Sequence, residues 1–388
     1  MKRSLLSASM IAGVMAGALA ISAPARADIT VGFVTSLSGV GSSIGIPYQK
    51  GIQAAYEYQS EIAGQKVRLV QLDDASDPST ATRDARKLVE DEKVDALIGT
   101  ATAPSTIAMA TAAAELKVPM IAVSPLPPQP ASAADQWSVS IPQPASLLVK
   151  VVADRMQRDG MKTVGYIGFS DAWGDLVYAG SKAAEERGQF KVLTNERYAR
   201  NDTSVTGQIL KVMAARPDAV LDGGSATQGA LPLLALAERG YKGGIYGTTA
   251  LVNADFIRVG GKAAEGIQVS TGPIIVAEQL PEDHFAKKLS MAFRDAYLKA
   301  NGTPTTDGFS AYSFDAWRVL ADAAGRAVKR ATPGTPEFRT ALRDEILRVH
   351  ELPGVHAVYN FKPGDNYGVD ERALVIVRLT NGAWKYAP

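Results

Sequence analysis

Short apolar runs alternate with amphipathic helical stretches along most of this chain, and this alternation restricts its possible folds more than any other feature. Each apolar run ends in a turn that leads into a helix, as in a parallel sheet whose strands are joined by crossover helices. The predicted strands are ITVGFVTSL, KVRLVQLDD, ALIGTA and PMIAVSP in a first series and VGYIGF, FKVLTNERY, AVLDGGS and GIYGTTA in a second. Two such series in succession predict an α/β fold with two doubly wound lobes.

The alternation stops after residue 272, where long helices follow with little strand between them. EDHFAKKLSMAFRDAYLKANG and SAYSFDAWRVLADAAGRAVKRA are predicted helices, and the ending, HAVYNFKPGDNYG followed by ALVIVRLTNGAWKY, is typical of a terminal β-hairpin. A chain that completes two lobes and then adds helices is expected to return to the first lobe, and the crossings then form a hinge. We therefore predict a first lobe from residues 28–143 and 273–354 and a second from residues 144–272 and 355–388.

The first 27 residues have the pattern of a cleaved secretory signal. Lys2 and Arg3 precede an apolar stretch rich in Gly, Ser and Ala, and Ala25-Arg26-Ala27 fits a signal-peptidase site. The apolar stretch is shorter than a membrane-spanning helix requires. We therefore expect an exported protein whose mature chain begins at Asp28.

The composition excludes several kinds of site. The chain contains no cysteine, so disulfides, thiolate metal sites and cysteine nucleophiles are absent. Its formal net charge is +1, from interspersed basic and acidic residues, which gives no support for a nucleic-acid partner. The histidines, His284, His350 and His356, show no metal-ligand spacing, and neither a nucleophile elbow nor a phosphate-binding loop is present. We expect neither a metal nor a cofactor.

The acidic stretch DDASDP, residues 73–78, allows two interpretations. Three aspartates in five residues could bind Ca²⁺, but the stretch lacks the central glycine and the closing glutamate of a calcium loop. Asp77 followed by Pro78 is typical of a helix N-terminus, with a capping carboxylate and a proline in the first turn. We favour the helix cap.

The ends of the predicted strands indicate where a ligand would bind. In open α/β sheets, ligands bind beyond the carboxyl ends of the strands, where helices begin. Here those ends are the loops 36–38, 100–105, 124–128, 170–174, 223–225 and 248–250. They carry hydroxyl groups, glycines and one large aromatic side chain, Trp173, and the only candidates for a general base are Asp171 and Asp175. Such loops suit ligand binding through positioned hydrogen bonds, so we predict a binding protein and not an enzyme.

Long blocks of the sequence resemble the periplasmic solute-binding proteins of ABC importers, in the branched-chain amino acid (Leu/Ile/Val-binding) family. The resemblance runs from Asp28 nearly to the end and rests on GFVTSLSGVGSSIGIPYQKGIQAA, VQLDDASDPSTATRDARKLVEDEKVDALIG, VGYIGFSDAWGDLVYAGSKAA, ALAERGYKGGIYGTTALVNADFIRVGG and ALRDEILRVHELPGVHAVYNFKPGDN. It implies a type I periplasmic binding protein, with two Rossmann-like lobes, a three-crossover hinge and a ligand clamped at that hinge. It also implies a periplasmic monomer whose partners are inner-membrane permease subunits and cytoplasmic ATPases.

The sequence departs from the amino-acid binders of this family at four places. The resemblance implies that a threonine of the carboxylate site falls on Pro128 and that the acidic residue of the ammonium site falls on Thr249. Two aromatic positions of the second lobe fall on Trp173 and Ser225. Without the acidic residue, a buried ammonium would lack its carboxylate partner, at a cost of several kcal/mol. The pocket is therefore expected to disfavour an amino acid.

A carboxylate can still bind such a pocket. Main-chain amides at Ala103 and Ser105 can donate to it, and so can the hydroxyls of Thr102 and Ser124. The proline-rich stretch AVSPLPPQPAS then forms a rigid apolar wall, and Trp173 forms an aromatic platform. The predicted ligand-binding residues are Ser36, Ser38, Thr102, Ala103, Ser105, Ser124, Leu126, Pro128, Trp173, Ser225, Thr249 and Ala250.

The stretches DDASDPSTAT and GPIIVAEQLP are similar to those of a subgroup of this family that binds aromatic carboxylates. We therefore predict an aromatic acid of the benzoate, hydroxybenzoate or phenylglyoxylate type as the ligand. One alternative keeps the transport role but has a branched-chain or other aliphatic amino acid as ligand. The other is an extracellular sensor that reports occupancy to a receptor.

Overall fold

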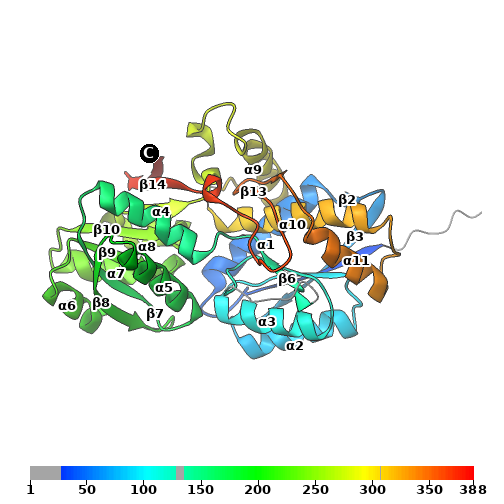
Figure 1. Cartoon of the computed structure of the whole chain (residues 1–388), viewed down its shortest axis with the longest axis horizontal. Coiled ribbons are helices and arrows are strands. Elements are labelled where there is room, and N and C mark those ends of the chain that lie inside the picture. The colour runs from blue at the N-terminus through cyan, green and yellow to red at the C-terminus, as the bar shows by residue number, and fades with distance from the viewer. Residues whose placement is uncertain (1–27, 128–134, 306) are drawn as a thin grey trace, which may run out of the picture.

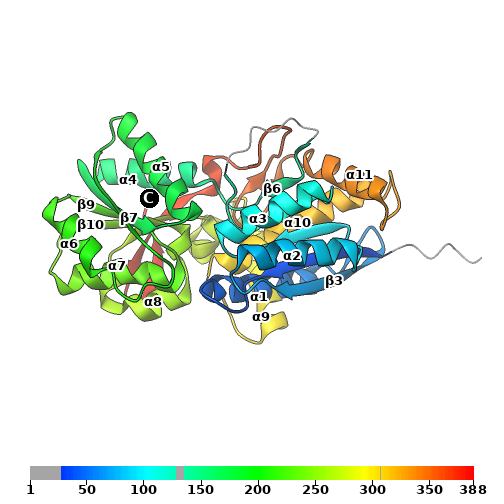
Figure 2. The same ribbon diagram turned by 90° about the horizontal axis from the view of Figure 1, so that it is seen from below.

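A computed structural model describes residues 28–127, 135–305 and 307–388. The predicted signal peptide, residues 1–27, and Pro128 lie outside the described residues. Two α/β lobes lie side by side (Figure 1), and the view from below shows helices stacked along each sheet (Figure 2). The two predicted βα series therefore form two doubly wound lobes, which confirms the predicted fold class.

The sheet of the first lobe has the strand order β2-β3-β1-β4-β5-β6. Its strands are β1 (Ile29–Thr35), β2 (Glu61–Ile62), β3 (Gln65–Asp73), β4 (Ala96–Gly99), β5 (Met120–Ala122) and β6 (Ser138–Ser140). All pairings are parallel except the short β2–β3 pair. Every residue of β1 is buried, because helices cover both faces of the sheet. Val31 and Phe33 face the cluster with α1 (Ser42–Tyr58) and α10 (Phe309–Ala327), whereas Val34 faces α2 (Pro78–Glu90) and α3 (Ala103–Glu115).

The sheet of the second lobe has the strand order β15-β14-β11-β10-β9-β7-β8. Its strands are β7 (Thr163–Phe169), β8 (Lys191–Tyr198), β9 (Ala219–Gly223), β10 (Gly244–Thr248), β11 (Gln268–Thr271), β14 (Val375–Thr380) and β15 (Ala383–Tyr386). The first five are parallel, and the last two add antiparallel strands from the C-terminal end of the chain.

The α-helices alternate with the strands as the sequence predicts, and the late helices belong to the first lobe. They are α1 (Ser42–Tyr58), α2 (Pro78–Glu90), α3 (Ala103–Glu115), α4 (Ala145–Arg158), α5 (Ala172–Glu186), α6 (Thr206–Ala214), α7 (Ala226–Glu238), α8 (Ala254–Gly260), α9 (Lys287–Asn301), α10 (Phe309–Ala327) and α11 (Pro336–Ile346). Helices α9 and α10 pack against α1, so the chain does return to the first lobe after β11. No helix within the described ranges is long and apolar enough to cross a membrane.

The N-terminus of α2 confirms the interpretation of the acidic stretch. Asp77 caps the helix by accepting a hydrogen bond from the Thr80 amide at 2.7 Å. Asp74 is buried and accepts hydrogen bonds from Ser36 Oγ at 2.6 Å and from the Ser76 amide at 2.9 Å. These aspartates therefore order a turn, and in the described part of the chain no group of three or more His, Cys, Asp and Glu is placed to hold a metal ion.

The C-terminal hairpin forms over a shorter segment than the sequence predicts. Strands β14 and β15 pair around Asn381-Gly382, where both residues have positive φ, as a tight two-residue turn requires. The preceding segment supplies only β13 (Val358–Tyr359), which pairs with β12 (Leu352–Pro353) in a separate two-stranded sheet.

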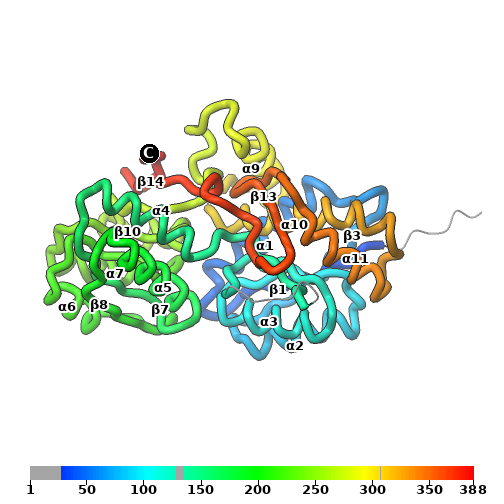
Figure 3. Tube along the Cα trace, in the orientation of Figure 1, coloured from blue at the N-terminus to red at the C-terminus, as the bar shows by residue number. Residues whose placement is uncertain are grey.

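The chain passes between the lobes at three connections: 141–144, residue 272 and the segment that leads to β14. Figure 3 shows the last of these, in orange to red, running from the lobe with α11 to β14. The boundary predicted at residues 354 and 355 precedes the point where the chain leaves the first lobe, because Asn366 O still accepts a hydrogen bond from the Ser140 amide at 2.8 Å. The division at residues 143 and 272 remains the one we propose.

Candidate ligand-binding cleft

A pocket lies between the two lobes, at the carboxyl ends of their parallel strands. The first lobe contributes Ile44, Tyr48, Ala101, Ala103, Ser124, Pro125, Phe309 and Tyr312. The second lobe and the first connection contribute Pro142, Leu148, Trp173, Arg200, Ser225, Thr249 and Ala250. The lobes touch around this cleft, since Ala103 and Trp173 belong to one apolar cluster and Asn253 Nδ2 donates to Ser43 O at 2.8 Å. A ligand in the cleft would therefore contact both lobes.

The structure brings half of the predicted ligand-binding residues together in this cleft. Ala103, Ser124, Trp173, Ser225, Thr249 and Ala250 line it. Ser36, Ser38, Thr102, Ser105 and Leu126 are outside its lining, and Pro128 lies outside the described residues. Whether the six lining residues bind a ligand remains a prediction.

The residues outside the lining have local hydrogen bonds that explain their positions. Ser36 Oγ donates to Asp74, and Ser38 Oγ donates to Asp73 Oδ2 at 2.8 Å. Thr102 caps α3, since its Oγ1 accepts from the Ser105 amide at 3.4 Å. These hydroxyls therefore stabilise the turns around the cleft, and the Ser105 amide that we expected to face the ligand is used by the helix cap.

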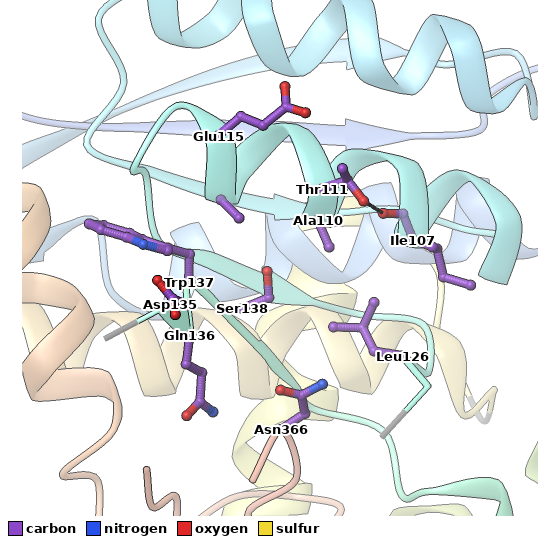
Figure 4. Close-up of a pocket in the computed structure, with 11 residues that line it drawn as sticks. Ile107, Ala110, Thr111, Glu115, Leu126, Asp135, Gln136, Trp137, Ser138 and Asn366 are labelled. Carbon is purple, nitrogen blue, oxygen red and sulfur yellow. Dashed lines mark hydrogen bonds between the residues drawn. The ribbon is translucent and has the colours of Figure 1, made fainter. Parts of the chain in front are cut away.

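Leu126 lines a different pocket, on the side of the first lobe between α3 and β6 (Figure 4). Ile107, Thr111 and Glu115 on α3 form one rim of this pocket, and Trp137 lies on the other side. Because Leu126 points into it, this residue does not contribute to the cleft between the lobes.

Sequence reasoning missed several residues of the cleft. Tyr48 is on α1, and Phe309 and Tyr312 are on α10, so none of them follows a strand, and no local signal places them near the ligand. Arg200 is different, because it follows β8 by two residues and lies at the same sheet edge as the predicted loops. The rule that ligands bind beyond the carboxyl ends of parallel strands (the strand-end rule), if applied to β8, would have identified Arg200.

Arg200 links three loops of the second lobe. Its Nε donates to Asp171 Oδ2 at 2.6 Å, its Nη1 donates to Ser225 Oγ at 3.2 Å, and its guanidinium lies 4.2 Å from the centre of the Phe169 ring. Asp171 also caps α5 by accepting from the Trp173 and Gly174 amides. This carboxylate is therefore engaged by a cation and two amides.

Trp173 lines the cleft from the second lobe. It lies in the first turn of α5, is 4% exposed, and donates from Nε1 to Gly224 O at 3.2 Å. This bond satisfies the indole N–H, so the ring presents an apolar surface to the cleft. Asp175, in the same first turn of α5, has a side chain that is 74% exposed and pairs with Arg197 on the protein surface.

Thr249 and Tyr312 connect the cleft to the hinge. Thr249 Oγ1 lies 2.9 Å from Thr271 Oγ1, and Tyr312 donates to Gln143 Oε1 at 2.6 Å. Gln143 Nε2 in turn donates to Ala373 O at 3.0 Å, which joins the first and third connections. Thr249 is thus buried beside neutral hydroxyl groups. Among the described residues, no acidic side chain lines the cleft.

His356 completes the packing of the hinge. It is fully buried, stacks on the Tyr312 ring with centroids 3.8 Å apart, and its Nε2 lies 2.9 Å from Gly308 O. A Cβ added to Gly272, in the second connection, would lie 1.9 Å from His356 Nδ1. Burial lowers the pKa of His356 to about 3, so this histidine is neutral at physiological pH. All three connections therefore meet around Tyr312 and His356.

A buried carboxyl behind Ser225 gives a pH-dependent prediction. Asp222 is completely buried at the end of β9, and its Oδ1 accepts from the Gly224 amide at 2.7 Å, whereas its Oδ2 has no partner among the described residues. Burial raises the pKa of Asp222 to about 8. The folded state therefore holds this proton more tightly than the unfolded state. This contribution to stability is complete below about pH 4 and is lost as pH rises through 8.

Asp222→Asn should therefore gain stability relative to the wild type as pH rises. Calorimetric melting temperatures between pH 5 and 9 would show the two proteins diverging toward pH 9. Asp175→Asn is the matched control, because that side chain is exposed, and it should follow the wild-type curve. Parallel curves for wild type and Asp222→Asn would contradict the assignment of this titration to Asp222.

Comparisons with known proteins agree with this geometry. Residues 28–383 match the family described as "Periplasmic binding protein". An extracellular ligand-binding receptor from Rhodopseudomonas palustris is 40% identical, with a TM-score of 0.88 over 93% of this chain and 99% of that one. A second solved receptor from the same species is also 40% identical, with a TM-score of 0.89 over 93% of this chain and all of that one.

More distant relatives extend the comparison. A Leu/Ile/Val-binding protein homolog of Brucella melitensis is 24% identical over 65% of this chain and 69% of its own length. The branched-chain amino acid transporter binding protein LivJ of Streptococcus pneumoniae, solved with isoleucine, shares the fold at 20% identity, with a TM-score of 0.77 over 92% of this chain and 98% of that one. With two α/β lobes, a cleft between them and a match over nearly its whole length, this chain belongs to the periplasmic binding protein family.

Proposed function

We propose that this protein is the solute-binding component of an ABC importer and that it captures a small aromatic carboxylate between its lobes. The observation that carries the proposal is the character of the cleft, whose lining is mostly apolar and aromatic, with Tyr48, Trp173, Phe309 and Tyr312 on its walls. An aromatic ring between such side chains gains both apolar burial and favourable ring contacts.

The polar groups of the cleft favour an anion. Helix α3 begins at Ala103, whose amide has no acceptor among the described residues, and Ser124 adds a hydroxyl nearby. A helix N-terminus attracts negative charge through its free amides and its dipole. Since the described lining has no Asp or Glu, the ammonium of an amino acid would be buried without a charged partner there, at a cost of several kcal/mol.

The mechanism that we propose is capture by lobe closure. A ligand that touches both walls binds the closed form more tightly than the open form and therefore shifts the population toward closure. The closed protein would then dock onto permease subunits in the inner membrane. The predicted export signal, residues 1–27, is consistent with this periplasmic role.

Ligand-dependent thermal stabilisation tests the ligand class directly. We expect benzoate, 4-hydroxybenzoate or phenylglyoxylate to raise the melting temperature of the chain that begins at Asp28, and leucine and valine to leave it unchanged. A ligand at 100 times its Kd adds about 2.7 kcal/mol to the free energy of unfolding.

Stabilisation by leucine or valine alone would instead favour the aliphatic amino acid alternative, which the names of the Brucella relatives support. Binding of an aromatic acid without transport by a membrane that carries the permease would favour the sensor alternative.

A further inference from the structure

The second-lobe wall of the cleft carries hydrogen-bond donors without a matching acceptor. Arg200 has five N–H groups, of which Nε donates to Asp171 and Nη1 donates to Ser225. Its side chain is only 13% exposed, and it lines the cleft. The remaining guanidinium N–H groups have no other acceptor within the described ranges, so they can donate a hydrogen bond to an oxygen atom of a ligand.

The bond from Arg200 also sets the orientation of the Ser225 hydroxyl. Ser225 Oγ accepts from Arg200 Nη1 at 3.2 Å, which occupies an oxygen lone pair and leaves the hydroxyl proton as the polar group still to be satisfied. Ser225 is 4% exposed and lines the cleft, and its Oγ donates to no other described group. A ligand atom beside it should therefore accept a hydrogen bond.

The N-terminus of α7 also attracts negative charge to this wall of the cleft. Ser225 is the N-cap residue of this 13-residue helix, yet its side chain makes no capping hydrogen bond and instead accepts one from Arg200. The first amides of α7 therefore add positive potential to the wall that already holds the Arg200 and Ser225 donors.

We propose that Arg200 and Ser225 form a second polar subsite, which selects ligands that carry a hydrogen-bond-accepting oxygen at the end remote from the first-lobe carboxylate site. This inference rests on the proposed function and deepens it, since it requires an aromatic acid with an oxygen substituent on its ring. The oxygen binds the second lobe while the carboxylate binds the first, so the substituent contributes directly to lobe closure.

Matched ligand pairs test this subsite on the wild-type protein. Isothermal titration with 3- and 4-hydroxybenzoate should show at least one of them binding about tenfold more tightly than its methyl counterpart, which has nearly the same shape but no acceptor. The amino counterpart, which is mainly a donor, should bind as weakly as the methyl compound.

Ser225→Ala should bring the hydroxy-to-methyl affinity ratio closer to one, because the variant loses the hydroxyl donor and keeps only the Arg200 donors. Ser181→Ala is the matched control, because Ser181 is a buried serine of the same lobe that bonds Tyr178 O and lies outside the cleft lining, and it should keep the wild-type ratio. Equal affinities for hydroxy and methyl acids in the wild type, or an unchanged ratio in Ser225→Ala, would overturn the subsite.

The outcomes separate the two proposals. If none of the aromatic acids binds, the proposed function fails. If benzoate and the methyl acids bind but the hydroxy acids gain nothing, the proposed function stands and the Arg200–Ser225 subsite fails.

Discussion

Asp315→Ala should lower the free energy of unfolding by about 3–5 kcal/mol. Asp315 is fully buried on α10 and accepts hydrogen bonds from the Val355 amide at 2.8 Å, the His356 amide at 2.9 Å and Tyr359 Oη at 2.8 Å. Alanine would leave three buried donors without an acceptor, and they lie in the segment that leads to the third connection. The substitution should therefore destabilise the segment that leads to the third connection as well as the core around α10.

Chemical denaturation of the wild type and the variant measures this effect. Asp322→Ala is the matched control on the same helix, because Asp322 pairs with Arg326 at a partly exposed site and should change stability by less than about 1 kcal/mol. A loss for Asp315→Ala that is as small as the control's would mean that the three donors find other partners and that Asp315 does not hold this segment.

Trp173→Ala should weaken an aromatic ligand by about 1–3 kcal/mol. The indole is buried in the cleft, and it belongs to the same apolar cluster as Ala103 of the opposite lobe. Its removal takes away both a ring surface for the ligand and a contact between the closed lobes. Isothermal titration with the best ligand of the thermal screen gives the affinity directly.

Trp173→Phe separates the contribution of the indole N–H bond from that of the aromatic ring. Phenylalanine keeps an aromatic face but loses the Nε1 bond to Gly224 O, so its affinity should fall between those of the wild type and the alanine variant. Trp137→Ala is a control for general loss of a tryptophan, because Trp137 lies in the pocket of Figure 4 and not in the cleft. An unchanged affinity in Trp173→Ala would remove this residue from the ligand site.

The strand-end rule located part of the cleft from sequence and failed where other side chains compete for the same loops. Trp173, Ser225 and Thr249 follow strands and do reach the cleft. Thr102 also follows a strand, but its hydroxyl caps α3, and Ser36 turns toward buried Asp74. A hydroxyl in a loop can bond either to a ligand or to a nearby turn, and local sequence does not distinguish the two.

The sequence by itself determined the two βα lobes, the return of the chain to the first lobe and the loops that border the cleft. These features follow from local periodicity and from the rule that parallel strands direct their carboxyl ends to one edge. Only the tertiary structure placed Tyr48 and Tyr312 in the cleft, joined Arg200 to Ser225, and gathered Gln143, Gly272 and His356 into one hinge. Such contacts join residues far apart in the chain, and they are decided by how helices and lobes pack, which no local pattern records.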